Sequence, residues 1–195
     1  IEKEAPMTFC PEAEYRLVNT EKGRCPGHFT AGFEASDALP RLVSIKAGTK
    51  VNVVPGKAKA AVEGFEMAAL EKAAAETKEE PGISFEFAAE GTVTELTANG
   101  IGAHASTPDV GNNALTGLLV FLEKLDFASC PQVDMVRKTA SLFPHGDVNG
   151  KTLGVAMEDE LSGNLTLSFN MLSVDAARMD GAFNGSVPVC GNEEN

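Results

Sequence analysis

The amino-acid sequence predicts an α+β fold in which an antiparallel sheet and a layer of helices form a two-layer sandwich. The first observation is that short segments with period-2 alternation or apolar runs lie between Gly and Pro, as strands do. The second is that longer segments between them have helical composition or spacing. The third is their order, which is strand, helix, strand, strand, helix. This order predicts a ferredoxin-like split βαβ sandwich with the helices on one face of the sheet.

Residues 1–25 show the weakest signal for a fold of their own. Residues 15–19 form one short apolar strand among Pro and charged residues, and the Cys25-Pro26-Gly27 turn follows them. We therefore expect residues 1–25 to be an edge piece of another domain and residues 26–195 to form the predicted sandwich. The sequence leaves open whether this sandwich is complete at its C-terminus.

The clearest strand and helix signals lie in the first half of the chain. Three strands are expected where apolar residues alternate between Gly and Pro: residues 42–46, 50–54 and 57–62. Residues 64–80 are rich in Ala, Glu and Lys and end at Pro81-Gly82, so we expect a helix there. Residues 83–89 and 92–98 follow as two strands joined across Glu90-Gly91, which predicts a hairpin.

A glycine-rich segment then places a histidine in a loop. Residues 100–108 read Gly-Ile-Gly-Ala-His-Ala-Ser-Thr-Pro, and little bulk surrounds the His104 ring. An incoming ligand explains such exposure more easily than packing does, although exposed loop histidines without a role are common. The residues by themselves leave both interpretations open.

The second half of the chain continues with helices and strands. Asn112 or Asn113 can cap a helix whose leucines recur at helical spacing. Residues 132–143 form a second, weaker helical pattern, and residues 165–174 and 181–189 close the chain as strands. These elements complete the predicted two-layer arrangement.

Composition restricts the classes of function. The formal net charge of −12 argues against nucleic-acid binding, because phosphate contacts need clustered Lys and Arg. No apolar stretch approaches the length of a membrane span, and the start at Ile1 is not a signal peptide. The four cysteines are too scattered for paired metal ligands, so we expect reduced thiols in a cytoplasmic protein. Because the chain opens on Ile1 and not on Met, we expect that preceding residues have been removed.

Three blocks of sequence carry a family pattern along nearly the whole chain. They are residues 9–15 with 20–23, residues 48–58, and residues 100–114 continued by 152–160 and 162–166. The first begins Phe-Cys-Pro-Glu, and the second reads Gly-Thr-Lys-Val-Asn-Val-Val-Pro-Gly-Lys-Ala. Together they resemble the metal-dependent dipeptidases and amidohydrolases of the aminoacylase and carboxypeptidase G superfamily, and most closely the PepV-type dipeptidases.

The resemblance implies that this chain is the lid domain of such an enzyme, with a short strand of the catalytic domain attached. It implies that His104 reaches over a site with two zinc ions and stabilises the oxyanion formed during amide hydrolysis, and that Asn52 contacts the substrate. Glu12 stands where the family has an aspartate metal ligand. The family's other ligands include an early His-x-Asp and a late His, but this chain has no histidine before His28 or after His145. The resemblance therefore implies no bound cofactor in this chain itself.

Two positions depart from the family pattern. Glu12 is one methylene longer than the usual aspartate and needs a shifted backbone to bind zinc. Ser186 stands where PepV-type enzymes carry an arginine that pairs with the substrate carboxylate, and a serine cannot supply that cationic fork. For Asn52, a hydrogen bond to a neighbouring turn is the alternative to substrate contact. The acidic run at residues 158–160 resembles a metal-binding cluster, but consecutive carboxylates point in different directions. We therefore interpret this run as a solvated loop.

The sequence thus predicts the lid of a zinc-dependent dipeptidase or related amidohydrolase, inactive by itself. Its expected partners are its own catalytic domain and a small peptide or N-acyl amino acid, with neither nucleic acid nor membrane. The alternative is a non-enzymatic binding or oligomerisation module that pairs an exposed sheet edge with a second copy to form a homodimer. If the gene encodes the family's metal-ligand motifs on both sides of this segment, the lid interpretation is favoured. If it does not, the interpretation as a binding or oligomerisation module is favoured.

Overall fold

The computed structural model describes residues 20–79 and 81–192 of the 195-residue chain. The strand expected over residues 15–19 and the Glu12 carboxylate lie outside the described residues, so both stay predictions. Within the described part, no helix is long and apolar enough to cross a lipid bilayer.

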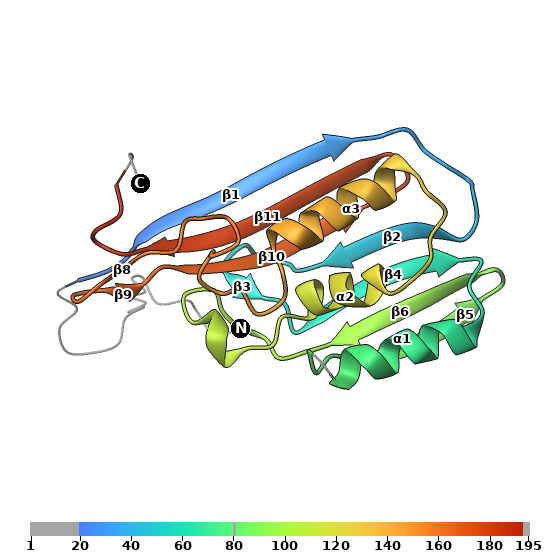
Figure 1. The fold of residues 1–195 in the computed structure, drawn as a ribbon, viewed down its shortest axis with the longest axis horizontal. Helices are drawn as coiled ribbons and strands as arrows, with labels where there is room; N and C mark the ends of the chain where they lie inside the picture. Colours follow the sequence, from blue (N-terminus) through green and yellow to red (C-terminus); the bar gives the residue numbers. More distant parts are fainter. Residues whose placement is uncertain (1–19, 80, 193–195) are drawn as a thin grey trace, which may run out of the picture.

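One antiparallel sheet of seven strands forms the first layer of the described chain (Figure 1). In spatial order its strands are β1 (Gly23–Gly32), β11 (Arg178–Val187), β10 (Thr166–Val174), β2 (Arg41–Ala47), β4 (Lys57–Glu63), β6 (Val93–Asn99) and β5 (Ser84–Glu90). The helices α1 (Met67–Glu79), α2 (Ala114–Glu123) and α3 (Pro131–Leu142) form the second layer. Two short strand pairs lie at one end of the sheet: β3 (Val53–Val54) with β7 (Ala103–His104), and β8 (Glu158–Asp159) with β9 (Gly163–Asn164).

The split βαβ unit is present in β4, α1 and β5. β4 and β5 are the two strands joined through α1, and β6 lies between them, antiparallel to both. The connection from β6 through α2 and α3 to β10 crosses two strands, because β2 lies between β10 and β4. The predicted fold class, an α+β sandwich with an antiparallel sheet, is therefore confirmed, with β2 inserted into the split βαβ pattern.

Most of the expected elements are confirmed within one to three residues. The expected strands at 42–46 and 57–62 are β2 and β4, and the hairpin at 83–98 is β5 with β6. The strand expected over 50–54 is wrong in its first part, because the Val53 amide donates to the Lys50 carbonyl in a turn and only Val53–Val54 are extended. The last strand begins earlier than expected, at Arg178.

The turn expected at Cys25-Pro26-Gly27 is wrong. These residues lie inside β1, a ten-residue strand that pairs along its whole length with β11. Gly and Pro are typical turn residues, but Pro is also found in edge strands, where its missing N–H can face away from the sheet. β1 is such an edge strand, and its partner is about 160 residues away in sequence. The proposed division of the chain between residues 25 and 26 stays a prediction.

The hydrophobic core fills the space between the sheet and the helices. Its leucines on α2 are fully buried, as the helical spacing predicts. Two groups of aromatic rings lie in this layer: Phe29, Phe143, Phe169 and Phe183 in one, and Phe85, Phe87 and Phe121 in the other. The first group of rings therefore packs β1, β10 and β11 against the end of α3, and the second group packs β5 against α2.

Asn113 connects the first turn of α2 to the sheet. Its side-chain oxygen accepts hydrogen bonds from the Leu115 and Thr116 amides at 2.9 and 3.3 Å, which makes it the N-cap. Its Nδ2 donates to the Phe169 carbonyl of β10 at 2.8 Å. Of the two asparagines expected as caps, Asn113 is the one used, and Asn112 instead donates to the Pro81 carbonyl at 3.1 Å.

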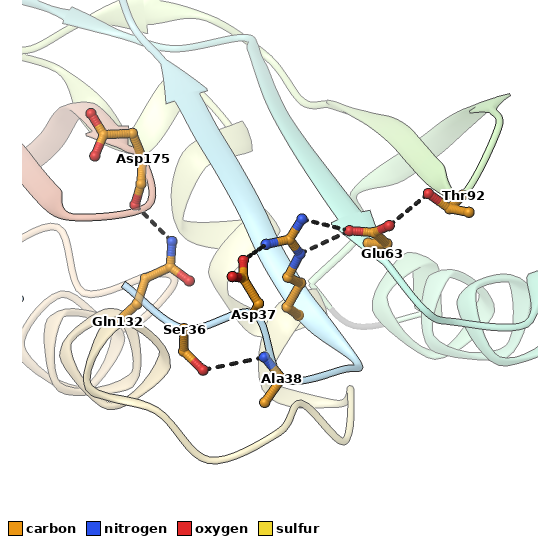
Figure 2. A network of polar contacts seen from close by, with 8 residues as sticks. Ser36, Asp37, Ala38, Glu63, Thr92, Gln132 and Asp175 are labelled. Atoms are coloured by element: carbon orange, nitrogen blue, oxygen red, sulfur yellow. Dashed lines mark hydrogen bonds and ion pairs between the residues drawn. The ribbon is translucent and has the colours of Figure 1, made fainter. Parts of the chain in front are cut away.

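A polar network closes the end of the sheet where β2 begins and β4 ends (Figure 2). The Arg41 guanidinium donates to Glu63 at 2.8 Å and to Asp37 at 2.7 Å. The Thr92 hydroxyl donates to the second Glu63 oxygen at 2.6 Å. Hydrogen bonds from Thr92 and Arg41 lower the pKa of the Glu63 carboxyl. The network holds β2, β4 and the β5–β6 turn together at the end opposite the β2–β4 connection.

Candidate functional site

The short β3–β7 pair places Asn52, the residue before β3, next to the strand that ends at His104. Val53 pairs with His104 and Val54 with Ala103, and the Ala105 amide donates to the Asn52 carbonyl at 3.0 Å. Directly paired residues of antiparallel strands place their side chains on the same face. His104 and Val53 therefore face the same way, away from the buried Val54. The sequence led us to expect His104 in an open loop, but the histidine is the last residue of a two-residue strand.

The His104 ring is exposed, and one of its nitrogens is bound by Ser106. Nδ1 lies 2.7 Å from the Ser106 hydroxyl oxygen and accepts the Ser106 amide hydrogen at an N···N distance of 3.2 Å. Nε2 has no hydrogen-bond partner among the residues that the structure describes. The ring is therefore held from one side and open to a ligand on the other.

Asn52 lies on a turn that packs on a bulge of β10. The bulge falls between Phe169 and Met171, and the buried Asn170 there donates to the Val51 carbonyl at 2.6 Å. Gly48 has a φ of 76°, and a Cβ at this position would overlap the Asn170 carbonyl oxygen, so the close approach requires glycine. The Asn52 carboxamide has no hydrogen-bond partner within the described chain. The alternative interpretation of Asn52, a side-chain bond to a neighbouring turn, is therefore not seen there.

The strand ends beside His104 carry a row of polar residues that the sequence did not single out as a set. The Thr166 hydroxyl donates to the Ser106 carbonyl at 3.4 Å, which links the His104 turn to β10. Thr166 pairs directly with Ser186 of β11, and Ser186 pairs with Arg24 of β1. Ser186 is buried, with 7% of its surface exposed, whereas Arg24 is exposed. Only the register of β1 reveals that an arginine lies opposite Ser186.

A cavity of about 70 Å³ lies behind the β3–β7 pair, between the start of α2 and the connection from α3 to β10. Val54 and Phe169 are among its apolar lining residues, and Thr116 and His145 are among its polar ones. The His145 Nδ1 lies 2.8 Å from the Thr116 hydroxyl oxygen. Burial lowers the pKa of the His145 imidazole, because the charged form loses solvation there. His145 is thus a half-buried packing residue of this cavity wall.

We expect the stability of the chain to fall in acid partly because of His145. Its folded-state pKa lies below the unfolded value of about 6.5, so the unfolded chain binds more protons between these two values. The contribution of His145 to the free energy of unfolding is therefore complete above about pH 6.5 and is lost as the pH falls toward the folded-state pKa. The measurement is the urea unfolding midpoint at about pH 8 and at about pH 5.

The variant His145→Asn should show a smaller loss of stability between these two pH values than the wild-type chain. The matched control is His28→Asn, because His28 is exposed on β1 and should keep the wild-type difference. Equal pH differences in the wild-type chain and in His145→Asn would contradict this assignment.

The acidic run at residues 158–160 is part of the β8–β9 hairpin and not a solvated loop. Asp159 accepts the Ser162 amide at 2.6 Å and the Cys190 amide at 3.0 Å, and these backbone bonds lower the pKa of its carboxyl. Glu158 and Glu160 are exposed. Asp159 therefore joins the hairpin to the residues that follow β11, a structural role that its sequence neighbours do not reveal.

The described residues contain no group of three or more His, Cys, Asp or Glu side chains placed to hold a metal ion. Glu12, which the resemblance places at a metal-ligand position, lies outside the described residues. Its role as a ligand therefore stays a prediction.

Comparisons with known proteins find sequence similarity to dipeptidases, although no protein-family model matches the chain. The Beta-Ala-Xaa dipeptidase of Lactobacillus delbrueckii subsp. lactis is 30% identical over 171 residues, covering 88% of this chain and 36% of that protein. A Bacillus subtilis (strain 168) protein named "Putative dipeptidase YtjP" is 34% identical over 173 residues, covering 85% of this chain and 36% of that protein. The chain spans about a third of the length of these relatives. Its sequence is therefore similar to one segment of these dipeptidases, which confirms the resemblance to dipeptidases.

Proposed function

We propose that this chain is the lid domain of a zinc-dependent dipeptidase or related amidohydrolase. In this proposal the lid closes over a catalytic site in another part of the protein and contributes His104 and Asn52 to it. The substrate is a small peptide or an N-acyl amino acid. In this proposal the chain alone is inactive, because the sequence has no histidine before His28 or after His145 to supply the family's metal ligands.

The single observation that carries the proposal is the β3–β7 pairing. It brings the backbone of Asn52, the residue before β3, beside the end of the strand that carries His104, and it leaves the imidazole exposed. The resemblance assigns these two residues to one site. The Asn52 carboxamide is also without a partner in the described chain. Polar groups that are positioned by a scaffold but left without partners are suited to bind a ligand.

The chemistry that this geometry supports is stabilisation of negative charge. Hydrolysis of an amide passes through a tetrahedral intermediate whose oxygen becomes negative, and a donor aimed at that oxygen lowers the barrier. The Nε2–H of His104 would serve as this donor, and the Asn52 amide would bind the polar groups of the substrate. Zinc ions, which the resemblance implies, would have to be held by other residues of the protein. No part of the proposal requires the described residues to bind them.

The experiment is a hydrolysis assay with the whole protein that contains this chain, supplied with zinc and offered dipeptides and N-acyl amino acids. We expect hydrolysis by the whole protein and none by the 195-residue chain. The Asn52→Ala variant should raise KM about two- to tenfold with little change in kcat, the size expected for the loss of one neutral hydrogen bond to substrate.

Asn164→Ala is the matched control, because Asn164 is exposed on β9 and should keep the wild-type KM. If the whole protein hydrolyses none of these substrates, the lid assignment fails and the non-enzymatic binding module takes its place. If hydrolysis occurs but Asn52→Ala and Asn164→Ala behave alike, Asn52 is not a substrate contact.

A further inference from the structure

Ser106 binds the inner nitrogen of the His104 ring with two groups at once. Its backbone amide donates to Nδ1 at 3.2 Å, and its hydroxyl oxygen lies 2.7 Å from the same nitrogen. The turn that carries both residues is closed by the Thr107 amide, which donates to the His104 carbonyl at 3.0 Å. A bond from the Thr166 hydroxyl to the Ser106 carbonyl attaches the turn to β10. Two hydrogen bonds, one within the turn and one to β10, therefore fix the position of Ser106 relative to the ring.

These contacts determine which nitrogen of neutral His104 carries the proton. A backbone amide can only donate, so the nitrogen that accepts its hydrogen must offer a lone pair. If Nδ1 carried the proton, two N–H groups would point at each other across 3.2 Å. The Ser106 hydroxyl can rotate to donate to Nδ1 as well. The amide therefore favours the tautomer with the proton on Nε2, and the hydroxyl, which can donate or accept, bonds to Nδ1 in either tautomer.

We infer that Ser106 is a positioning residue that holds the His104 imidazole as the Nε2–H tautomer with this donor directed outward. This inference rests on the proposed function for its catalytic meaning, since an oxyanion donor must present a proton and not a lone pair. Ser106 does not touch the reacting atoms in this scheme. It removes the competing Nδ1–H state, in which the exposed Nε2 would repel an oxyanion.

The first test is the ¹⁵N NMR spectrum of the histidine side chains in the 195-residue chain at about pH 8, where an ordinary imidazole is neutral. The chain has three histidines, so the His104→Gln variant identifies the His104 signals by their loss. We expect Nδ1 of His104 to resonate as an unprotonated nitrogen and Nε2 as a protonated one. A spectrum in which Nδ1 carries the proton overturns the inference.

The variant Ser106→Ala removes the hydroxyl and keeps the amide. Because the amide that selects the tautomer is retained, Ser106→Ala should keep His104 mainly in the Nε2–H form. Ser106→Thr keeps both the hydroxyl and the amide and should show the wild-type spectrum. Ser141→Ala is the matched control, because Ser141 is exposed at the end of α3 and its hydroxyl donates within that helix. A predominant Nδ1–H form in Ser106→Ala also overturns the inference, because the amide would then not select the tautomer.

The kinetic arm uses the whole protein and separates this inference from the proposed function. Ser106→Ala removes one of the two contacts that orient the ring, so it should lower kcat about two- to tenfold with KM nearly unchanged, and Ser106→Thr should recover it. If a His104→Ala variant lowers kcat but Ser106→Ala does not, the positioning role is overturned while the lid function stands. If the NMR results are as expected and His104→Ala leaves kcat unchanged, the catalytic role of the lid fails while the control of the tautomer by Ser106 stands.

Discussion

We expect the His104→Ala substitution to lower kcat of the whole protein about 10²- to 10³-fold and to leave KM nearly unchanged. The reason is that the imidazole would interact with the oxyanion only as negative charge develops, so its loss raises the barrier without weakening the ground-state complex. The structure supports this role because the ring on β7 is exposed and its Nε2 has no hydrogen-bond partner within residues 20–79 and 81–192. The measurement is steady-state kinetics with a dipeptide that the wild-type protein cleaves.

The matched control for this variant is His28→Ala. His28 is also an exposed histidine on a strand, but it lies on β1, opposite Ala182 of β11. It should keep the wild-type kcat. If His104→Ala raises KM and leaves kcat unchanged, His104 binds substrate uniformly and is not an oxyanion donor. If both variants keep the wild-type kcat, His104 is an exposed histidine without a catalytic role.

The Phe169→Ala substitution should lower the free energy of unfolding of the chain by about 3–5 kcal/mol. Phe169 is only 2% exposed, and its ring centre lies 4.6 Å from that of Phe143 and 5.9 Å from that of Phe29. Truncation would leave a cavity where β1, β10 and the end of α3 meet. The measurement is urea unfolding followed by circular dichroism, with the two-state slope compared between variants.

Two further variants separate cavity formation from other effects. Phe169→Leu keeps most of the side-chain volume and should cost less than about 1.5 kcal/mol, provided that its neighbours repack. Phe65 packs edge-to-face against Phe127 and is only partly buried, so Phe65→Ala should cost less than Phe169→Ala. If Phe169→Ala and Phe65→Ala lower the free energy of unfolding equally, the aromatic group around Phe169 is not a main part of the core.

Elements with strong local signals were predicted correctly from the sequence. β2 and β4 alternate between buried and exposed positions over much of their length, and the β5–β6 hairpin turns at a glycine with a φ of 62°. The helix at α2 has regularly spaced leucines and an asparagine cap. In each case the pattern that decides the structure lies within about ten consecutive residues, so the sequence displays it directly.

The arrangement of the candidate site could be predicted only in part, because its residues come from distant segments, and their functional roles stay predictions. The motif around His104 identified the histidine, and its neighbour in space, Asn52, was identified by resemblance. Neither spacing nor composition shows that these two residues lie beside each other. Ser106 was visible as the second residue after the histidine, but its two contacts to Nδ1 depend on a turn that only coordinates reveal.

Composition, periodicity and capping residues were sufficient to predict the α+β class, the split βαβ unit and the exposed histidine, because these follow from side-chain patterns along short stretches. The long-range pairings required the folded chain. β1 contains Gly and Pro and becomes a strand because β11 offers it a hydrogen-bonded edge. The β3–β7 pair and the row of Arg24, Ser186 and Thr166 exist for the same reason, since strand register is a contact between segments and has no signal in either segment alone.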